Sequence, residues 1–95
     1  MNILIIEDDE LTAEFIKRVL AKEHHFVQVS HDGIEGFKRA QAHSYDVLIL
    51  DISLPGKDGM TICRELRRLL VSTPILMLSS YADEQTKISC LDAGA

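Results

Sequence analysis

Residues 51–59 read Asp51-Ile52-Ser53-Leu54-Pro55-Gly56-Lys57-Asp58-Gly59, and they directly follow the apolar run Val47-Leu48-Ile49-Leu50. The run does not alternate apolar with polar residues, which predicts a central strand that is covered on both faces. The segment then places one carboxylate at the end of this strand, before a loop that contains proline and glycine. Ligands bind at the carboxyl ends of the strands in parallel α/β sheets. Asp51 is therefore the first candidate for a functional residue.

Four acidic residues in a row follow a second apolar run, residues 3–6. If the two runs form neighbouring parallel strands, their acidic ends meet in one pocket. Carboxylates in a small cleft repel one another unless a hard cation lies among them, and oxygen-only coordination favours Mg²⁺. Glu7 and Asp8 directly follow the strand, so we assign them to the metal. Asp9 and Glu10 already lie at the start of a helix, where capping explains them.

Short apolar runs alternate with segments of helical periodicity along the chain, which predicts a parallel sheet with crossover helices. We expect strands at residues 3–6, 26–29, 46–50 and 75–78. We expect helices at residues 11–22, 34–42, 60–70 and 83–93, the last ending at Gly94. The flavodoxin-like order 2-1-3-4-5 makes the first and third strands neighbours and puts helices on both faces. The predicted fold is thus α/β, a flavodoxin-like doubly wound parallel sheet of order 2-1-3-4 with the fifth strand and helix missing.

The first three predicted helices each carry an apolar stripe that we expect to face the sheet. The stripe of the first helix consists of Leu11, Phe15, Ile16, Val19 and Leu20. Those of the second and third helices consist of Ile34, Phe37 and Ala40, and of Ile62, Cys63, Leu66, Leu69 and Leu70. Cys63 and Cys90 are expected to be reduced core thiols.

Size and charge exclude several classes of protein. Ninety-five residues make one domain, and a net charge of −5 argues against direct binding of nucleic acid. No apolar run approaches membrane-spanning length, and Met1 leads straight into the first strand without a signal peptide. We therefore expect a cytoplasmic domain without a membrane partner.

The expected chemistry of the strand ends is phosphoryl transfer. A carboxylate such as Asp51 can attack phosphorus to give a mixed anhydride, and Mg²⁺ neutralises the charges that come together. A hydroxyl pair, Ser79-Ser80, follows the predicted strand at residues 75–78 and belongs to the same edge. The four histidines have no ligand spacing, so we expect surface or loop positions for them.

Several linked motifs resemble those of a response-regulator receiver domain of two-component signalling. They are Ile5-Ile6-Glu7-Asp8-Asp9, Leu50-Asp51 through Leu54-Pro55 to Asp58-Gly59, Pro74-Ile75-Leu76-Met77-Leu78-Ser79-Ser80, and Ala93-Gly94-Ala95. The resemblance implies that Asp51 accepts a phosphoryl group from a phosphohistidine on a sensor histidine kinase. It also implies that Glu7, Asp8, Asp51 and the main-chain carbonyl of Ser53 hold Mg²⁺. Ser79 corresponds to the switch hydroxyl of the family.

The resemblance also suggests what the whole protein regulates, and it shows where this sequence departs from the family. With Glu at position 7, the chain resembles the branch of the family whose receivers carry a winged-helix DNA-binding domain. This resemblance implies regulation of transcription and contact with DNA only through that effector domain. Family members continue into a fifth strand, a Lys-Pro pair and a fifth helix. We therefore expect residues 1–95 to be a receiver domain that is incomplete at its C-terminus, lacks its effector and self-associates.

Two other functions remain open at this point. Phosphohydrolases of the haloacid-dehalogenase type also place an aspartate after an apolar strand, but they carry Asp-x-Asp where this chain has Asp51-Ile52-Ser53. A protein-interaction module could keep the same fold without being phosphorylated. We favour a phosphoacceptor in signalling, which is no enzyme beyond its own phosphorylation and dephosphorylation.

Overall fold

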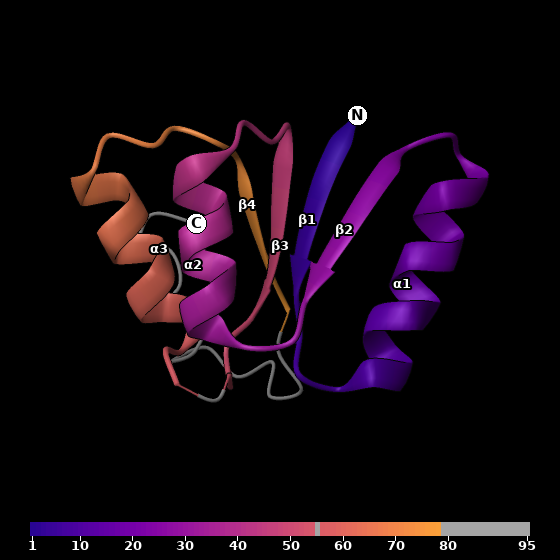
Figure 1. Cartoon of the computed structure of the whole chain (residues 1–95), viewed down its shortest axis with the longest axis horizontal. Helices are drawn as coiled ribbons and strands as arrows, with labels where there is room; N and C mark the ends of the chain where they lie inside the picture. The colour runs from indigo at the N-terminus through magenta and orange to yellow at the C-terminus, as the bar shows by residue number, and fades with distance from the viewer. Residues whose placement is uncertain (55, 79–95) are drawn as a thin grey trace.

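The computed structural model describes residues 1–54 and 56–78, which form a layered α/β fold (Figure 1). The elements in this part of the chain are β1 (Asn2–Ile6), α1 (Glu10–Lys22), β2 (Phe26–Ser30), α2 (Gly33–Ala42), β3 (Val47–Asp51), α3 (Gly59–Arg68) and β4 (Ile75–Leu78). All adjacent strands pair in parallel, in the order β2-β1-β3-β4. The predicted flavodoxin-like arrangement of the first four strands is confirmed.

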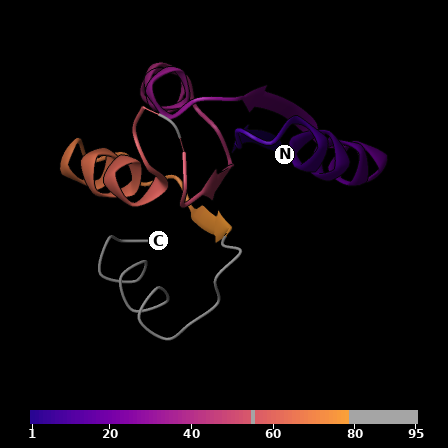
Figure 2. The ribbon, with the colours of Figure 1, turned by 90° about the horizontal axis from the view of Figure 1, so that it is seen from below.

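Helices cover both faces of the sheet (Figure 2). The helix α1 lies on one face, and α2 and α3 lie together on the other. The predicted boundaries of these seven elements differ from the observed ones by at most two residues. The fourth predicted helix, residues 83–93, and its cap at Gly94 lie outside the described residues.

An aspartate begins each described helix, at the point where the chain leaves the sheet. Asp9 accepts a hydrogen bond from the main-chain N–H of Leu11, and Asp32 accepts one from that of Glu35. Asp58 caps α3 in the same way. An N-cap of this kind satisfies one of the N–H groups that a helix start leaves without a partner. The capping role that we expected for Asp9 is confirmed.

Two apolar cores lie on the two faces of the sheet. The larger core joins β1 and β3 to α2 and α3; its buried members are Leu4, Ile6, Ala40, Tyr45, Leu48, Leu50, Ile62, Cys63, Leu66 and Ile75. The smaller core contains Ile3, Ile5 and Ile49, with Ile16 and Leu20 of α1 packed against it. The middle strands β1 and β3 contribute to both cores, which is why their sequences are apolar without alternation.

The stripe predicted for α1 is only partly correct. Ile16 and Leu20 pack on the sheet, and Ala13 is fully buried, whereas Leu11 and Phe15 are 83% and 68% exposed. Ala13 precedes Ile16 by three residues and Leu20 by seven, so the three lie on one face of the helix. The face that contacts the sheet therefore includes only one side of the predicted stripe. Val19 is exposed as well.

Three other predicted core positions are wrong for local reasons. Ile34, in the first turn of α2, is half exposed, and its side chain lies beside Gly56 of the loop after β3 and outside both cores. The helix α3 ends at Arg68, so Leu69 and Leu70 do not extend its stripe. Leu70 instead adopts a left-handed conformation with φ of 62° and is 89% exposed.

Self-association is the first testable expectation from this fold. Leu11 and Phe15 of α1 and Leu76 of β4 are exposed on the same side of the sheet, and among the described residues β4 pairs with β3 alone. Exposed apolar patches and sheet edges favour association with another chain. Sedimentation at micromolar concentration should detect dimers or larger species, and Phe15→Glu should shift the population toward the monomer. A monomeric wild-type chain with cooperative unfolding would contradict this prediction.

Candidate metal site at the carboxyl ends of β1 and β3

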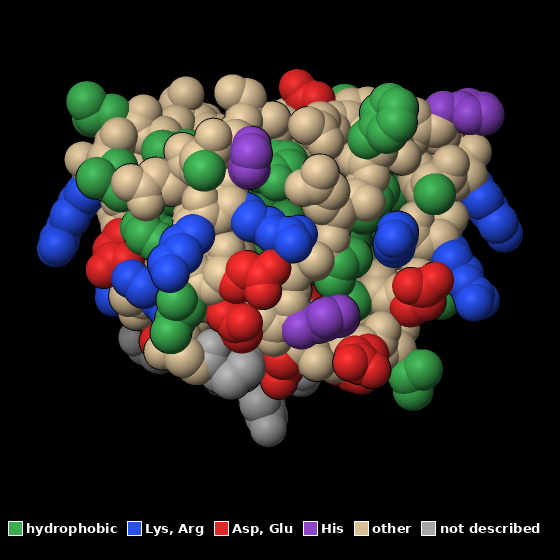
Figure 3. Space-filling view, viewed as in Figure 1, with side chains coloured by type: hydrophobic (Ala, Val, Ile, Leu, Met, Phe, Trp, Pro, Cys, Tyr) green, Lys and Arg blue, Asp and Glu red, His purple; other side chains and the backbone are tan. Residues whose placement is uncertain are grey.

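The parallel pairing of β1 with β3 brings the two acidic strand ends together. Ile6 and Leu50 are register partners, so Glu7 and Asp51 follow at the same level of neighbouring strands. Carboxylate oxygens of Glu7, Asp8 and Asp51 all lie within 4.8 Å of one another. The structure therefore brings together the three carboxylates that we assigned to a metal. Figure 3 shows acidic side chains gathered over this end of the molecule.

The neighbouring strand β2 fixes the backbone of Glu7. The main-chain N–H of Glu7 donates to the carbonyl oxygen of Ser30 at 3.0 Å. Its carbonyl oxygen accepts a hydrogen bond from Nδ1 of His31, also at 3.0 Å. Its carboxylate accepts a longer hydrogen bond, of 3.3 Å, from the N–H of Asp9. Glu7 is thus a buried residue, 5% exposed, whose position depends on the exit loops of both strands.

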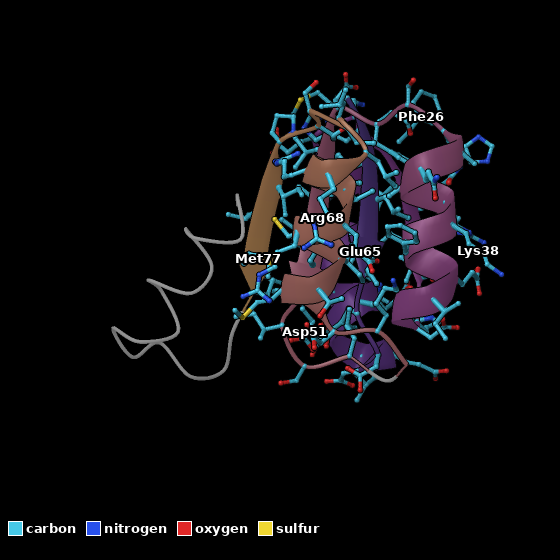
Figure 4. All side chains as sticks on the ribbon, turned by 90° about the vertical axis from the view of Figure 1, so that its left-hand side faces the viewer. Phe26, Lys38, Asp51, Glu65, Arg68 and Met77 are labelled. Atoms are coloured by element: carbon cyan, nitrogen blue, oxygen red, sulfur yellow. The ribbon has the colours of Figure 1, made fainter. Side chains whose placement is uncertain are left out.

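Asp51 lies where β3 passes into the loop before α3 (Figure 4). Its Oδ1 accepts a hydrogen bond of 3.2 Å from the main-chain N–H of Ser53, which orients the carboxylate. The start of α3 approaches the same strand end closely, since Gly59 N–H donates to the carbonyl oxygen of Ile52 at 3.0 Å. A Cβ at position 59 would collide with the carbonyl oxygen of Asp51. Only glycine lets the helix begin this close to Asp51.

The pKa of Glu7 is raised by its burial beside other carboxylates. The pKa of this carboxyl is raised from 4.5 to about 7, chiefly by burial and in addition by a hydrogen bond to Asp51 and by the negative charge of Asp51. The N–H of Asp9 acts in the opposite direction, by favouring the carboxylate. The cause is the one expected for an acid that is desolvated beside another acid.

The donor set fits a hard divalent cation. It consists of carboxylate oxygens, one buried, one half-buried and one exposed, so a bound ion would remain open to water on the side of Asp8. This is the composition that Mg²⁺ favours, because Mg²⁺ keeps several waters and takes few carboxylates. Ser53 is an exposed residue of the loop after β3, two positions from Asp51. The proposed switch residue Ser79 lies outside the described residues.

Comparison with known proteins gives the family. A model of the response regulator receiver domain matches residues 3–95. The chain is 40% identical over 94 residues to the response regulator ArlR of Staphylococcus aureus; the match covers 99% of this chain and 42% of ArlR. This chain therefore belongs to the response regulator receiver domains of two-component systems, and it spans less than half the length of that relative.

Solved receiver structures agree with this assignment. The BeF3-activated N-terminal receiver domain of Klebsiella pneumoniae RstA superposes with a TM-score of 0.94 at 36% identity, covering 100% of this chain and 80% of that one. The response regulator TrrA of Thermotoga maritima, in complex with Mg²⁺-BeF, gives a TM-score of 0.87 at 28% identity, covering 98% and 81%. No described helix is long and apolar enough to cross a membrane.

The sequence prediction missed the contact between His31 and Glu7. His31 is an exposed loop residue, as we expected, but its ring hydrogen-bonds the main chain of the buried acid. The signal was present in the strand order, because β2 lies next to β1 and His31 follows β2 directly. Ligand spacing along one segment, the criterion that we applied to histidines, does not detect a contact between two strand ends.

The raised pKa of Glu7 predicts how stability depends on pH without metal. The unfolded chain releases this proton near pH 4.5 and the folded chain near pH 7, so the folded chain binds more protons between these values. Stability contributed by Glu7 is therefore complete below pH 4.5 and is lost as the pH rises to about 7. The side chain in Glu7→Gln cannot ionise. The unfolding free energy of this variant, relative to that of wild type, should therefore rise by about 1–3 kcal/mol between pH 4.5 and pH 7.

Urea unfolding in the presence of EDTA at pH 4.5 and pH 8 measures this difference. Glu14→Gln, at an exposed position of α1 away from the acidic cluster, is the control for the loss of a surface carboxylate. A constant difference between Glu7→Gln and wild type at both pH values would show that Glu7 does not titrate in this way.

Proposed function

We propose that this chain is the phosphoryl-accepting signalling domain of a two-component response regulator, with Asp51 as the acceptor. The observation that carries the proposal is the cluster of Glu7, Asp8 and Asp51 within 4.8 Å at the ends of two adjacent parallel strands. Glu7, Asp8, Asp51 and the main-chain carbonyl of Ser53 are the proposed ligands of Mg²⁺. The complex of TrrA with Mg²⁺-BeF supports this choice of metal.

The reaction needs little beyond a positioned carboxylate. An oxygen of Asp51 forms a bond to the phosphorus of a phosphohistidine, the P–N bond breaks, and the imidazole leaves with its electron pair. Mg²⁺, when bound, neutralises negative charge on the carboxylates and on the phosphoryl oxygens. The hydrogen bond from the main-chain N–H of Ser53 to Oδ1 orients the Asp51 carboxylate.

The proposed partner is a sensor histidine kinase, which supplies the phosphohistidine, and the proposed location is the cytoplasm. The output in the whole protein is regulation of transcription through a DNA-binding effector domain. The similarity to the response regulator ArlR, of which this chain matches 42%, supports an output region elsewhere in the protein. A glutamate at position 7 agrees with the DNA-binding branch of the family.

The hydroxyl of Ser79 is the proposed switch. Leu78 is the register partner of Asp51, and Ser79 is the next residue along the chain. Phosphorylation adds roughly −1.5 to −2 charge at neutral pH, together with oxygens that accept strong hydrogen bonds. A hydroxyl at this strand end can donate to one of them, which would couple Asp51 to the segment after β4.

The acceptor assignment is tested with acetyl phosphate and Mg²⁺, followed by intact mass. Wild type should gain one phosphoryl group, EDTA should prevent the gain, and Asp51→Asn should abolish it, because an amide is a poor nucleophile. Repeated release of inorganic phosphate would favour the phosphohydrolase, and the absence of any adduct on wild type would favour the interaction module. An adduct of unchanged yield on Asp51→Asn would exclude this acceptor.

The switch assignment has its own test in the amide signals of residues 79–83. Phosphorylation should shift these signals in wild type, and Ser79→Ala should lose most of the shift while retaining the phosphoryl adduct. Ser79→Thr, which keeps the hydroxyl, should behave like wild type. An equal shift in Ser79→Ala would show that this hydroxyl has no part in the response.

A further inference from the structure

A lysine in the loop after β3 is held by side chains from both α2 and α3. The ammonium of Lys57 forms an ion pair with the carboxylate of Glu65 on α3. It also lies 4.4 Å from the centroid of the Phe37 ring on α2, a cation–π contact. The side chains of Lys57 and Glu65 are 24% and 36% exposed, so water screens this pair less than it screens a fully exposed one.

The backbone of the same loop segment packs against the start of α2. A Cβ at Gly33, the first residue of α2, would collide with the carbonyl oxygen of Lys57. At Gly56 the backbone has a φ of 81°, which glycine adopts readily, and the residue lies against the side chain of Ile34. Lys57 therefore joins the loop to α2 by its main chain and to both helices by its side chain.

The other end of this loop carries the candidate site. Asp51 begins it, and Ser53, whose carbonyl is a proposed Mg²⁺ ligand, lies two residues further on. Asp58 caps α3 at the point where the loop ends. Lys57 is the only cationic residue between Asp51 and Gly59. The contacts of Lys57 hold the end of the loop nearer α3 against the helices, and β3 holds the end nearer Asp51.

We propose that Lys57 is a positioning residue, whose contacts with Glu65 and Phe37 hold the loop in the conformation in which the N–H of Ser53 donates to Asp51, and thereby hold in place the proposed Mg²⁺ ligand, the Ser53 carbonyl. The inference rests on the proposed Mg²⁺ site. A metal that binds only the ordered loop binds more weakly when the loop is ordered in a smaller fraction of molecules. An ion pair and a cation–π contact each contribute little, so their loss changes this fraction without unfolding the chain.

A second ion pair provides the comparison. Arg39 and Glu35 lie 2.9 Å apart on α2, with side chains that are 38% and 51% exposed. Arg39 also donates to the carbonyl oxygen of Val29, so this pair ties α2 to β2 and not to the loop. An ion pair that only stabilises the fold should behave as this one does.

Mg²⁺ titration by calorimetry on the whole chain tests the proposal, with urea unfolding in EDTA as a separate measure of stability. Lys57→Met keeps most of the apolar stem and should weaken Mg²⁺ binding about three- to tenfold. Lys57→Arg keeps the charge and the contact with an aromatic ring, so it should restore most of the affinity. Glu65→Gln should weaken binding in the same direction, and Glu35→Gln should not.

A reciprocal readout separates positioning from simple stabilisation. Since coupling between two sites acts in both directions, Mg²⁺ should shift the ring signals of Phe37 in wild type and much less in Lys57→Met. Equal Mg²⁺ affinity in wild type and Lys57→Met, with only the unfolding free energy reduced, would overturn the inference. A wild-type chain that binds no Mg²⁺ and accepts no phosphoryl group would instead overturn the proposed function.

Discussion

The structure depends on the parallel pairing of β1 with β3, because this pairing puts two acidic strand ends side by side. Each strand is apolar along its length and ends at the same edge of the sheet, so Glu7 and Asp51 meet at the point where the apolar core stops. Burial there makes ionisation of Glu7 unfavourable, and the charge of Asp51 adds to the effect. The sheet thus holds in place an arrangement of carboxylates that would separate if they were free to move.

Close contacts between glycine and neighbouring groups let the helices pack around this edge. Gly36 of α2 lies against the side chain of Ile6, the last residue of β1, and Gly59 lies against the carbonyl of Asp51. A larger residue at either position would push a helix away from the strand end. The same close packing brings the loop after β3 onto the first turn of α2 at Gly33. The geometry of the acidic cluster is therefore set by the α2 and α3 face as well as by the strands.

Features that depend on the order of elements could be predicted from the sequence, and features that depend on side-chain contacts between elements could not. The unbroken apolar runs before Glu7 and Asp51 predicted buried strands, and the flavodoxin-like order made these two strands neighbours, so that their carboxylates meet. The apolar stripe of α1 showed that the helix is amphipathic, but it did not show which part of the stripe contacts the sheet; Leu11 is exposed and Ala13 is buried. The contacts of Lys57 join residues that no pattern along the chain connects.

The electrostatics of the cluster suggest why a receiver site of this form responds to a change in charge. Because its pKa is about 7, Glu7 is only partly ionised at neutral pH, so the metal-free site holds less negative charge than its three carboxylates would carry when fully ionised. A divalent cation and the Glu7 proton compete for the same oxygens, so Mg²⁺ binding under the proposed function releases this proton. Under the proposed function, a phosphoryl group on Asp51 would add negative charge beside a cation that compensates the carboxylates. The added charge would attract hydrogen-bond donors, and donors on neighbouring loops would have to move to reach it.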